Sequence, residues 1–118
     1  AVSGCGLTIL SGDDSLTLPM AAVGGQGVIS VVANIVPVDV RKMTDAIAAG
    51  DYIEARKWHD KLFKLGGSLL SLATNPVPIK AAMAMLGMCS EELRLPLVPL
   101  DDAARVKLSS VLKDYGLL

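Results

Sequence analysis

Two adjacent carboxylates, Asp13 and Asp14, are the first candidates for chemistry in this sequence. A pair of aspartates can act as acid and base in proton transfer, or bind a metal ion together. The pair follows Ser11-Gly12 at the end of a short apolar segment, and α/β enzymes place their ligands at the carboxyl ends of parallel strands. Adjacent aspartates at a strand-to-helix turn more commonly divide between capping the helix and facing solvent. From the residues alone, both interpretations of the pair stay open.

The other candidates for chemistry are weaker. His59 is the only histidine, so the sequence cannot supply a metal site with several histidines, and it offers little support for most Ser/His/Asp arrangements. It is expected on a helix, at the surface or its boundary. The glycine-rich segment 24–27 resembles a phosphate-binding loop only loosely, because it precedes a predicted strand instead of following one and opening a helix. It is interpreted as a helix stop with a tight turn, and no metal site is expected.

Composition excludes several classes of protein. Hydrophobic residues make up 52% of the 118, which is too many for a disordered chain. The formal net charge is -1 and no basic cluster exceeds two residues, so nucleic-acid binding through a basic face is not expected. No charged residue lies between Asp14 and Asp39, but prolines and glycines interrupt that stretch, which argues against a membrane helix. Cys5 and Cys89 are expected to be reduced, buried thiols of a cytosolic protein.

The first part of the chain has an α/β pattern. Leu7–Leu10 and Val28–Val32 are short apolar segments, expected to be strands buried on both faces, as in a parallel sheet covered by helices. A helix over about residues 15–23 is expected to join them, which makes a βαβ unit. Two strands are too few for a stable sheet, so the unit looks like part of something larger.

After Pro37 the pattern becomes helical and stays so to the end. Each predicted helix has a capping aspartate, a proline interruption or a terminal glycine as its start or stop signal. The predicted helices run from Asp39 to Gly50, from Asp51 (with Glu54 as its capping partner) to Leu69, from Ile79 to Gly87, and from Asp101 or Asp102 to Gly116.

Four segments of this sequence resemble, in order and spacing, the end of the dihydrodipicolinate synthases, also called 4-hydroxy-tetrahydrodipicolinate synthases. The likeness covers essentially all 118 residues, and four segments in register are specific although no single one is decisive. The segments are LTILSGDD (7–14), GGQGVISVVANIVP (24–37), NPVPIK (75–80) and LRLPLVPL (93–100).

The resemblance implies a fold. Members of this family are TIM (β/α)8 barrels followed by a carboxy-terminal helical appendage. Residues 1–49 then correspond to the last two βα units of the barrel and residues 50–118 to the appendage, in a chain that is the carboxy-terminal part of a longer protein. The family is cytoplasmic and commonly homotetrameric, so a homo-oligomer is expected here as well, and exposed strand edges favour association in any case.

The resemblance also implies an activity. The family condenses pyruvate with aspartate semialdehyde on the route to diaminopimelate and lysine, without a cofactor. A barrel lysine forms a Schiff base with pyruvate, and a tyrosine-centred relay moves protons. These groups lie on earlier strands, so no catalytic residue is expected in this chain, which alone is expected to be inactive. All its lysines follow the last predicted strand, and none matches the family's lysine: Lys42, Lys57, Lys61, Lys64, Lys80, Lys107 and Lys113.

Three substrate-binding positions carry over from the family. Ile29 matches the residue whose backbone borders bound pyruvate, and Gly12 matches a glycine at a strand end where a side chain would intrude on substrate. Asn75 matches an asparagine that approaches the substrate from the appendage. Judged by residue type alone, Ile29 would be a core residue, Gly12 a turn former and Asn75 a cap before proline.

Two other functions stay open at this point. N-acetylneuraminate lyases and keto-deoxy sugar-acid aldolases share the barrel, the lysine and the pyruvate chemistry, although SGDD and LRLPLVPL look more like the synthases. A different class is a non-catalytic helical module whose apolar stripes bind a partner or a second copy. An open reading frame that continues upstream into a lysine-bearing strand would distinguish the enzymes from the module.

Overall fold

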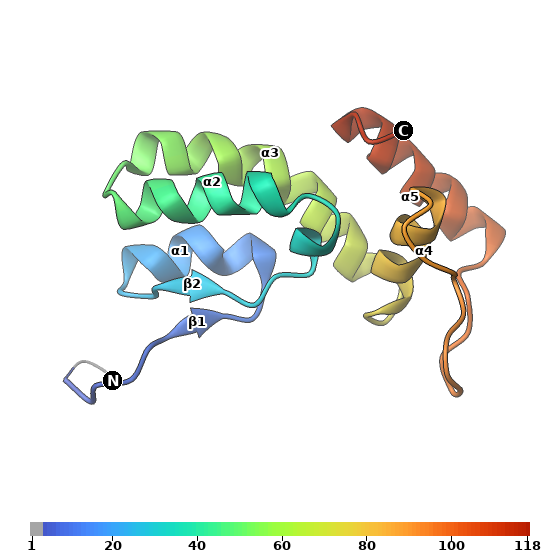
Figure 1. Ribbon diagram of the computed structural model, residues 1–118, viewed down its shortest axis with the longest axis horizontal. Helices are drawn as coiled ribbons and strands as arrows, with labels where there is room; N and C mark the ends of the chain where they lie inside the picture. The colour runs from blue at the N-terminus through green and yellow to red at the C-terminus, as the bar shows by residue number, and fades with distance from the viewer. Residues whose placement is uncertain (1–3) are drawn as a thin grey trace.

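Two short parallel strands begin the fold, and helices make up the rest of it (Figure 1). The protein is represented by a computed structural model that describes residues 4–118. Strand β1 (Leu10–Ser11) pairs in parallel with β2 (Gly27–Val28), with Leu10 opposite Gly27 and Ser11 opposite Val28. The other elements are the 3-10 helices η1 (Asp14–Leu16) and η2 (Val32–Asn34) and the α-helices α1 (Thr17–Ala22), α2 (Pro37–Ala48), α3 (Tyr52–Ser71), α4 (Val77–Met85) and α5 (Asp102–Tyr115).

The βαβ order is confirmed, but the strands are shorter than predicted and are not buried on both faces. Each has two residues, and Val32, predicted to end the second strand, lies in η2. Leu7 is 68% exposed and Leu10 is 44% exposed. The prediction of doubly buried strands is therefore wrong for this chain. The physical reason is that, within residues 4–118, each strand has a single neighbour and an unpaired edge.

The connection between β1 and β2 is helical, as the sequence predicts. The expected helix over residues 15–23 is present as η1 followed by α1. It stops at the glycine-rich segment, where Gly24 has φ +103° and the amide of Gly25 donates to the Met20 carbonyl at 2.8 Å. A Cβ at Gly25 would lie 2.9 Å from that carbonyl oxygen. Segment 24–27 is thus a helix stop, not a phosphate loop.

Helices α2 and α3 lie side by side and form the main layer (Figure 1). Helix α2 begins at Pro37, two residues before the predicted start at Asp39. Proline suits the first helical position because its φ is already helical and its missing N–H would have no partner there. Asp39 lies instead in the first turn, where its charge interacts favourably with the helix dipole.

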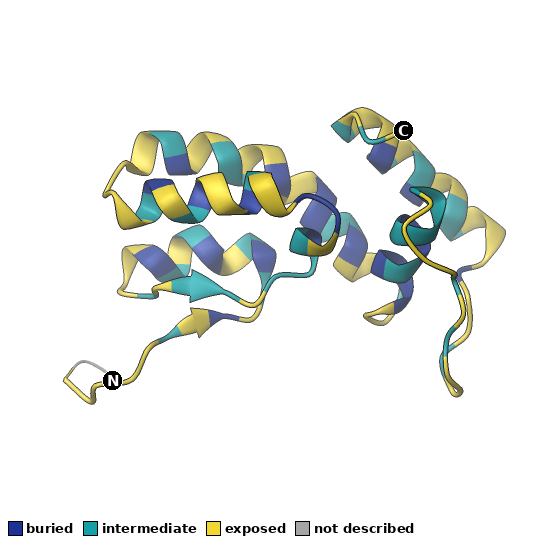
Figure 2. Cartoon of the chain, in the orientation of Figure 1, coloured by how far each residue is buried: buried dark blue, intermediate teal, exposed yellow. Residues whose placement is uncertain are grey.

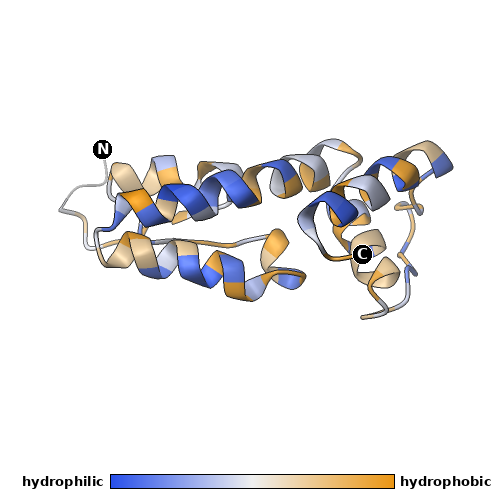
Figure 3. Cartoon of the chain, turned by 90° about the horizontal axis from the view of Figure 1, so that it is seen from above, coloured by the Kyte–Doolittle hydropathy of each residue, from blue (hydrophilic) through white to orange (hydrophobic). Residues whose placement is uncertain are grey.

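Helix α3 begins where predicted. The carboxylate of Asp51 accepts a hydrogen bond from the amide of Glu54 at 2.9 Å. Leu62, Leu65 and Leu69 are buried along one face, and His59 lies at the boundary of the surface, as expected. Figures 2 and 3 show buried and exposed residues, and hydrophobic and hydrophilic ones, alternating along the long helices. This pattern is that of amphipathic helices packed on a shared core.

Helices α4 and α5 form a second group. Helix α3 packs against both of them and also against η1 and η2, which follow the two strands. Helix α4 begins at Val77, two residues before the predicted Ile79, and Pro78 is at its second position. Helix α5 starts as predicted, because Asp101 accepts from the amide of Ala104 at 2.7 Å, and it ends at Gly116 with φ +89°. Segment 93–100 has no regular structure, in agreement with its two prolines.

Two expectations from composition have different outcomes. Cys5 and Cys89 are both exposed, so the prediction of buried thiols is wrong. Cys5 lies in a bend before β1, and Cys89 lies in a bend after α4. Within residues 4–118, no helix combines the length and the apolar character needed to cross a membrane.

A polar cluster joins α2, α3 and α5. The carboxylate of Asp39 accepts hydrogen bonds from Lys61 Nζ and from Tyr115 Oη, both at 2.7 Å. Burial alone would raise the pKa of Asp39, but the hydrogen bonds from Lys61 and Tyr115 outweigh it, so the pKa is lowered from its ordinary value of 3.8. Burial and the same Asp39 contact raise the pKa of Tyr115.

This cluster predicts an acid-sensitive contribution to stability. Because the pKa of Asp39 is lower in the folded chain, the contribution is present above the unfolded pKa and is lost as the pH falls through the folded pKa. We expect Tyr115→Phe to lower the free energy of unfolding by about 1 kcal/mol at neutral pH, and by less at about pH 2.5. Urea unfolding at both pH values measures this difference. Tyr52→Phe is the control, since Tyr52 Oη donates only to the uncharged Ala21 carbonyl. An equal loss at both pH values for Tyr115→Phe would contradict the prediction.

Candidate functional site at the carboxyl ends of the strands

Gly12 and Ile29 lie next to each other at the carboxyl ends of the two strands. The register pairs Ser11 with Val28, and the amide of Ile29 donates to the Ser11 carbonyl at 2.8 Å. Each of the two residues directly follows its strand. Parallel pairing therefore brings together two of the three predicted site residues.

Both residues face open space. The side chain of Ile29 is 69% exposed, so its assignment as a core residue by type is wrong. A Cβ at Gly12 would meet no atom within 4 Å, and the φ of Gly12 is outside the left-handed region. The local backbone therefore does not require glycine at position 12, and a Cβ there would meet only open space.

Asn75 is placed separately. It lies in the loop between α3 and α4 and is exposed. Within residues 4–118, its side chain makes no hydrogen bond, so it does not cap α4, whose N-cap is Pro76. Helix α4 packs against η2, which follows β2 closely. This packing links the element after Asn75 to the site, and within residues 4–118 no hydrogen bond joins Asn75 to Gly12 or Ile29.

The two adjacent aspartates have different roles. Asp13 caps η1, because its Oδ1 accepts from the amide and the hydroxyl of Ser15, both at 2.7 Å. Asp14 is only 6% exposed, so the expectation that one aspartate faces solvent is wrong. Its carboxylate accepts from Ser30 Oγ at 2.5 Å and from the amides of Val31 and Val32 at 2.9 and 3.2 Å. The sequence interpretation missed Ser30 altogether.

Neither aspartate belongs to a metal site in the described part of the chain. No group of three or more histidine, cysteine, aspartate or glutamate side chains there could hold a metal ion. Asp13 and Asp14 both have donors from the chain itself. Within residues 4–118, both aspartates act as hydrogen-bond acceptors.

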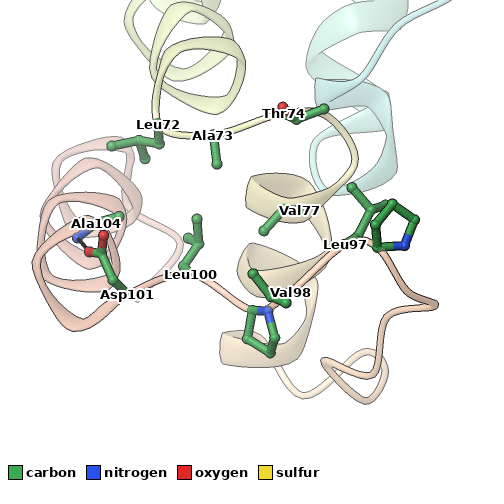
Figure 4. A pocket seen from close by; sticks show the side chains of 11 residues that line it. Leu72, Ala73, Thr74, Val77, Leu97, Val98, Leu100, Asp101 and Ala104 are labelled. Carbon is green, nitrogen blue, oxygen red and sulfur yellow. Dashed lines mark hydrogen bonds between the residues drawn. The ribbon is translucent and has the colours of Figure 1, made fainter.

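A separate cavity of about 380 Å³ lies among the end of α3, α4, segment 96–101 and the start of α5 (Figure 4). Apolar side chains such as Leu72, Val77 and Leu100 line most of it. Its one charged residue, Asp101, is engaged in capping α5. Thr74 supplies the only other polar side chain of the lining, so the cavity is mostly apolar and we regard it as a packing gap.

The site has no candidate nucleophilic lysine of its own. The lysines lie on α2, α3, α4 and α5, and none is on β1, on β2 or in the turns that follow them.

A parallel strand pair with open carboxyl ends, followed by a helical layer, defines an α/β protein of the kind that binds ligands at its strand ends. The chain belongs to the dihydrodipicolinate synthetase family, whose model matches residues 3–115. The resemblance stated from the sequence is thereby confirmed.

Named relatives agree with this assignment. The chain is 51% identical over 116 residues to the 4-hydroxy-tetrahydrodipicolinate synthase of Pelobacter propionicus, and 50% identical over 116 residues to that of Geotalea uraniireducens. Each match covers 97% of this chain and 40% of the relative. The chain thus spans about 40% of the length of the relatives that it matches.

Solved structures agree as well. The crystal structure of dihydrodipicolinate synthase from Aquifex aeolicus matches with a TM-score of 0.92 and 47% identity, over 97% of this chain and 39% of that one. A monomeric dihydrodipicolinate synthase variant matches with a TM-score of 0.91 and 38% identity, over 98% of this chain and 38% of that one. The strand pair and the helical layer are therefore arranged as in part of these larger proteins.

Proposed function

We propose that this chain is the carboxy-terminal part of a 4-hydroxy-tetrahydrodipicolinate synthase, a lyase of lysine and diaminopimelate biosynthesis. The whole protein would condense pyruvate with aspartate semialdehyde through a lysine Schiff base. The observation that carries the proposal is the match of nearly the whole chain, at about half identity, to relatives with this name. A cytoplasmic homo-oligomer that needs no cofactor is part of the same proposal.

Within that protein, residues 1–49 would complete a TIM barrel with its last two βα units, and residues 50–118 would form the helical appendage. The parallel register of β1 and β2, with a helical connection between them, supports the first assignment. The run of three helices from α3 onward supports the second. The close packing of α2 on α3 would join the two parts.

Gly12, Ile29 and Asn75 would border pyruvate. The backbone of Ile29 and the open space over Gly12 would form one wall, supported by their adjacent places at the strand ends. Asn75, whose side chain makes no hydrogen bond within residues 4–118, would approach from the loop before α4. The chain supplies shape and hydrogen bonding, and the lysine comes from another part of the protein.

The mass of the native product and borohydride trapping with pyruvate test this proposal. Lysine and pyruvate lose water to form an imine, and borohydride reduces it to a stable secondary amine, so one covalent adduct is expected on a protein well above 12.3 kDa. A native mass near 12.3 kDa without an adduct would reject the synthase and favour a binding module. Consumption of aspartate semialdehyde, set against cleavage of N-acetylneuraminate, distinguishes the synthase from the related aldolases.

A further inference from the structure

We propose that Asp14 is a positioning residue for the pyruvate site. Its buried carboxylate binds Ser30 and the amides of Val31 and Val32, and so holds the segment after β2 against the turn after β1. We call this set of hydrogen bonds the Asp14 clasp. This inference rests on the proposed function and deepens it. Asp14 lies two residues after Gly12, and its partner Ser30 directly follows Ile29. The clasp thus connects the segments that carry the two adjacent site residues.

Three hydrogen bonds form the clasp, and all of them cross between the two segments. Oδ1 of Asp14 accepts from Ser30 Oγ at 2.5 Å, across 16 positions of sequence. Oδ2 accepts from the amides of Val31 and Val32, at 2.9 and 3.2 Å. Hydrogen bonds to an ionised carboxylate are roughly twice as strong as neutral ones. The backbone just after Ile29 is therefore fixed by a side chain from the other strand's turn.

Ser30 extends the clasp into η2. Its hydroxyl donates to Asp14 and accepts from the amide of Ala33 at 2.9 Å. Three consecutive amides, those of Val31, Val32 and Ala33, are thus satisfied by two side chains. These amides begin a helical turn and would otherwise lack partners. The conformation of segment 29–33 depends on both side chains.

Helix α3 packs against the two segments that the clasp joins. It packs against both η1 and η2. A Cβ at Gly66 of α3 would lie 3.3 Å from the Cβ of Asp14 and 3.6 Å from Cγ1 of Val32. Close approach at a residue without a side chain leaves Asp14 no room to withdraw toward α3. Asp14 is held by donors on one side and by helix backbone on the other.

Asp14 has the features of a positioning group, not of an acid or a base. It is 6% exposed, and both of its oxygens are occupied by donors from the chain. It therefore acts on a ligand at Gly12 and Ile29 only through the backbone. A shift of about 1 Å in a positioning group can lower kcat/KM on the order of 100-fold. Because Asp14 shapes the wall of the site and touches no reacting atom, we expect this loss to appear as weaker pyruvate binding.

Kinetics of the full-length protein test the role. We expect Asp14→Ala to raise the KM for pyruvate on the order of 100-fold, with a much smaller change in kcat. Asp14→Asn keeps an oxygen for the two amides and should rescue much of the loss, to roughly 10-fold. Tyr115→Phe, which removes a hydrogen bond from the remote Asp39 cluster, is the control and should leave the KM unchanged. An unchanged KM in Asp14→Asn would overturn the proposal even if Asp14→Ala failed to fold.

Hydrogen exchange separates this inference from the proposed function. In Asp14→Asn and Asp14→Ala, peptides that cover residues 29–34 should exchange at least about 10-fold faster than in the unaltered protein, while those from α2 keep their rates. Faster exchange together with a raised KM supports the positioning role. If exchange is faster in the variants but the unaltered protein forms no pyruvate adduct, the proposed function is rejected and the clasp has a structural role only. Unchanged exchange rejects the clasp itself.

Discussion

Gly12→Val is expected to raise the KM for pyruvate by about 10- to 100-fold in the full-length protein, with little change in Tm. The structure explains why the KM should change while the Tm does not. A Cβ at position 12 meets no atom within 4 Å and the backbone is not left-handed, so the Cβ of valine introduces no clash within residues 4–118. The added side chain instead enters open space at the end of β1, next to the residue pair that we propose borders pyruvate. Steady-state kinetics and thermal melting of the same preparation measure both quantities.

Gly67→Val is the matched control for this prediction. Gly67 also has open space around its Cβ position and an ordinary φ, but it lies on α3. We expect it to leave the KM for pyruvate unchanged. If Gly12→Val left the kinetics unchanged and lowered Tm, Gly12 would be a turn residue only, and the pyruvate site would have to be placed elsewhere.

The helices could be predicted because their signals are local. Asp51 and Asp101 each accept a hydrogen bond from an amide three residues later, and Gly116 ends its helix in a left-handed conformation. These interactions need only a few neighbouring residues. Where the predicted start was late, at α2 and α4, the missed signal was also local, because a proline lies in the first turn of both helices.

The strands could not be predicted in the same way, because burial depends on what surrounds them. VISVV has the composition of a strand buried on both faces, yet its last residue joins η2 and Ile29 is exposed. A strand needs partners on its edges and layers on its faces, and residues 4–118 give each strand a single partner. The apolar pattern describes an environment that only a larger sheet would provide.

The candidate site was predictable in part. Gly12 and Ile29 are neighbours because both follow parallel strands, which the βαβ pattern implies. The Asp14–Ser30 contact was not foreseen, because it joins residues 16 positions apart through tertiary packing. One signal did exist, since Ser30 is the only polar residue in the apolar run from Val28 to Ala33. A lone hydroxyl in a segment that its apolar pattern predicts to be buried requires a partner.

Leu69→Ala is expected to lower the free energy of unfolding by about 2–5 kcal/mol, and Leu70→Ala by less than about 1 kcal/mol. The two leucines are adjacent on α3, but Leu69 is fully buried and Leu70 is 37% exposed. Leu69 belongs to the core cluster that also contains Ile79 of α4 and Leu108 of α5. Its removal leaves a cavity between helices that cannot easily collapse, because they are tied together through their other core residues.

Urea unfolding followed by circular dichroism measures both variants on the same scale, provided that the slopes with denaturant agree. The change in helix propensity contributes equally to the two losses of stability, because both variants replace leucine by alanine near the end of the same helix. What remains is the difference in burial between Leu69 and Leu70, to which α4 and α5 contribute through the shared core cluster. Equal losses for the two variants would mean that this cluster does not pack on α3 as described. The loop that carries Asn75 would then lose its fixed place relative to η2 and the strand ends, and Asn75 could not approach a ligand held by Gly12 and Ile29.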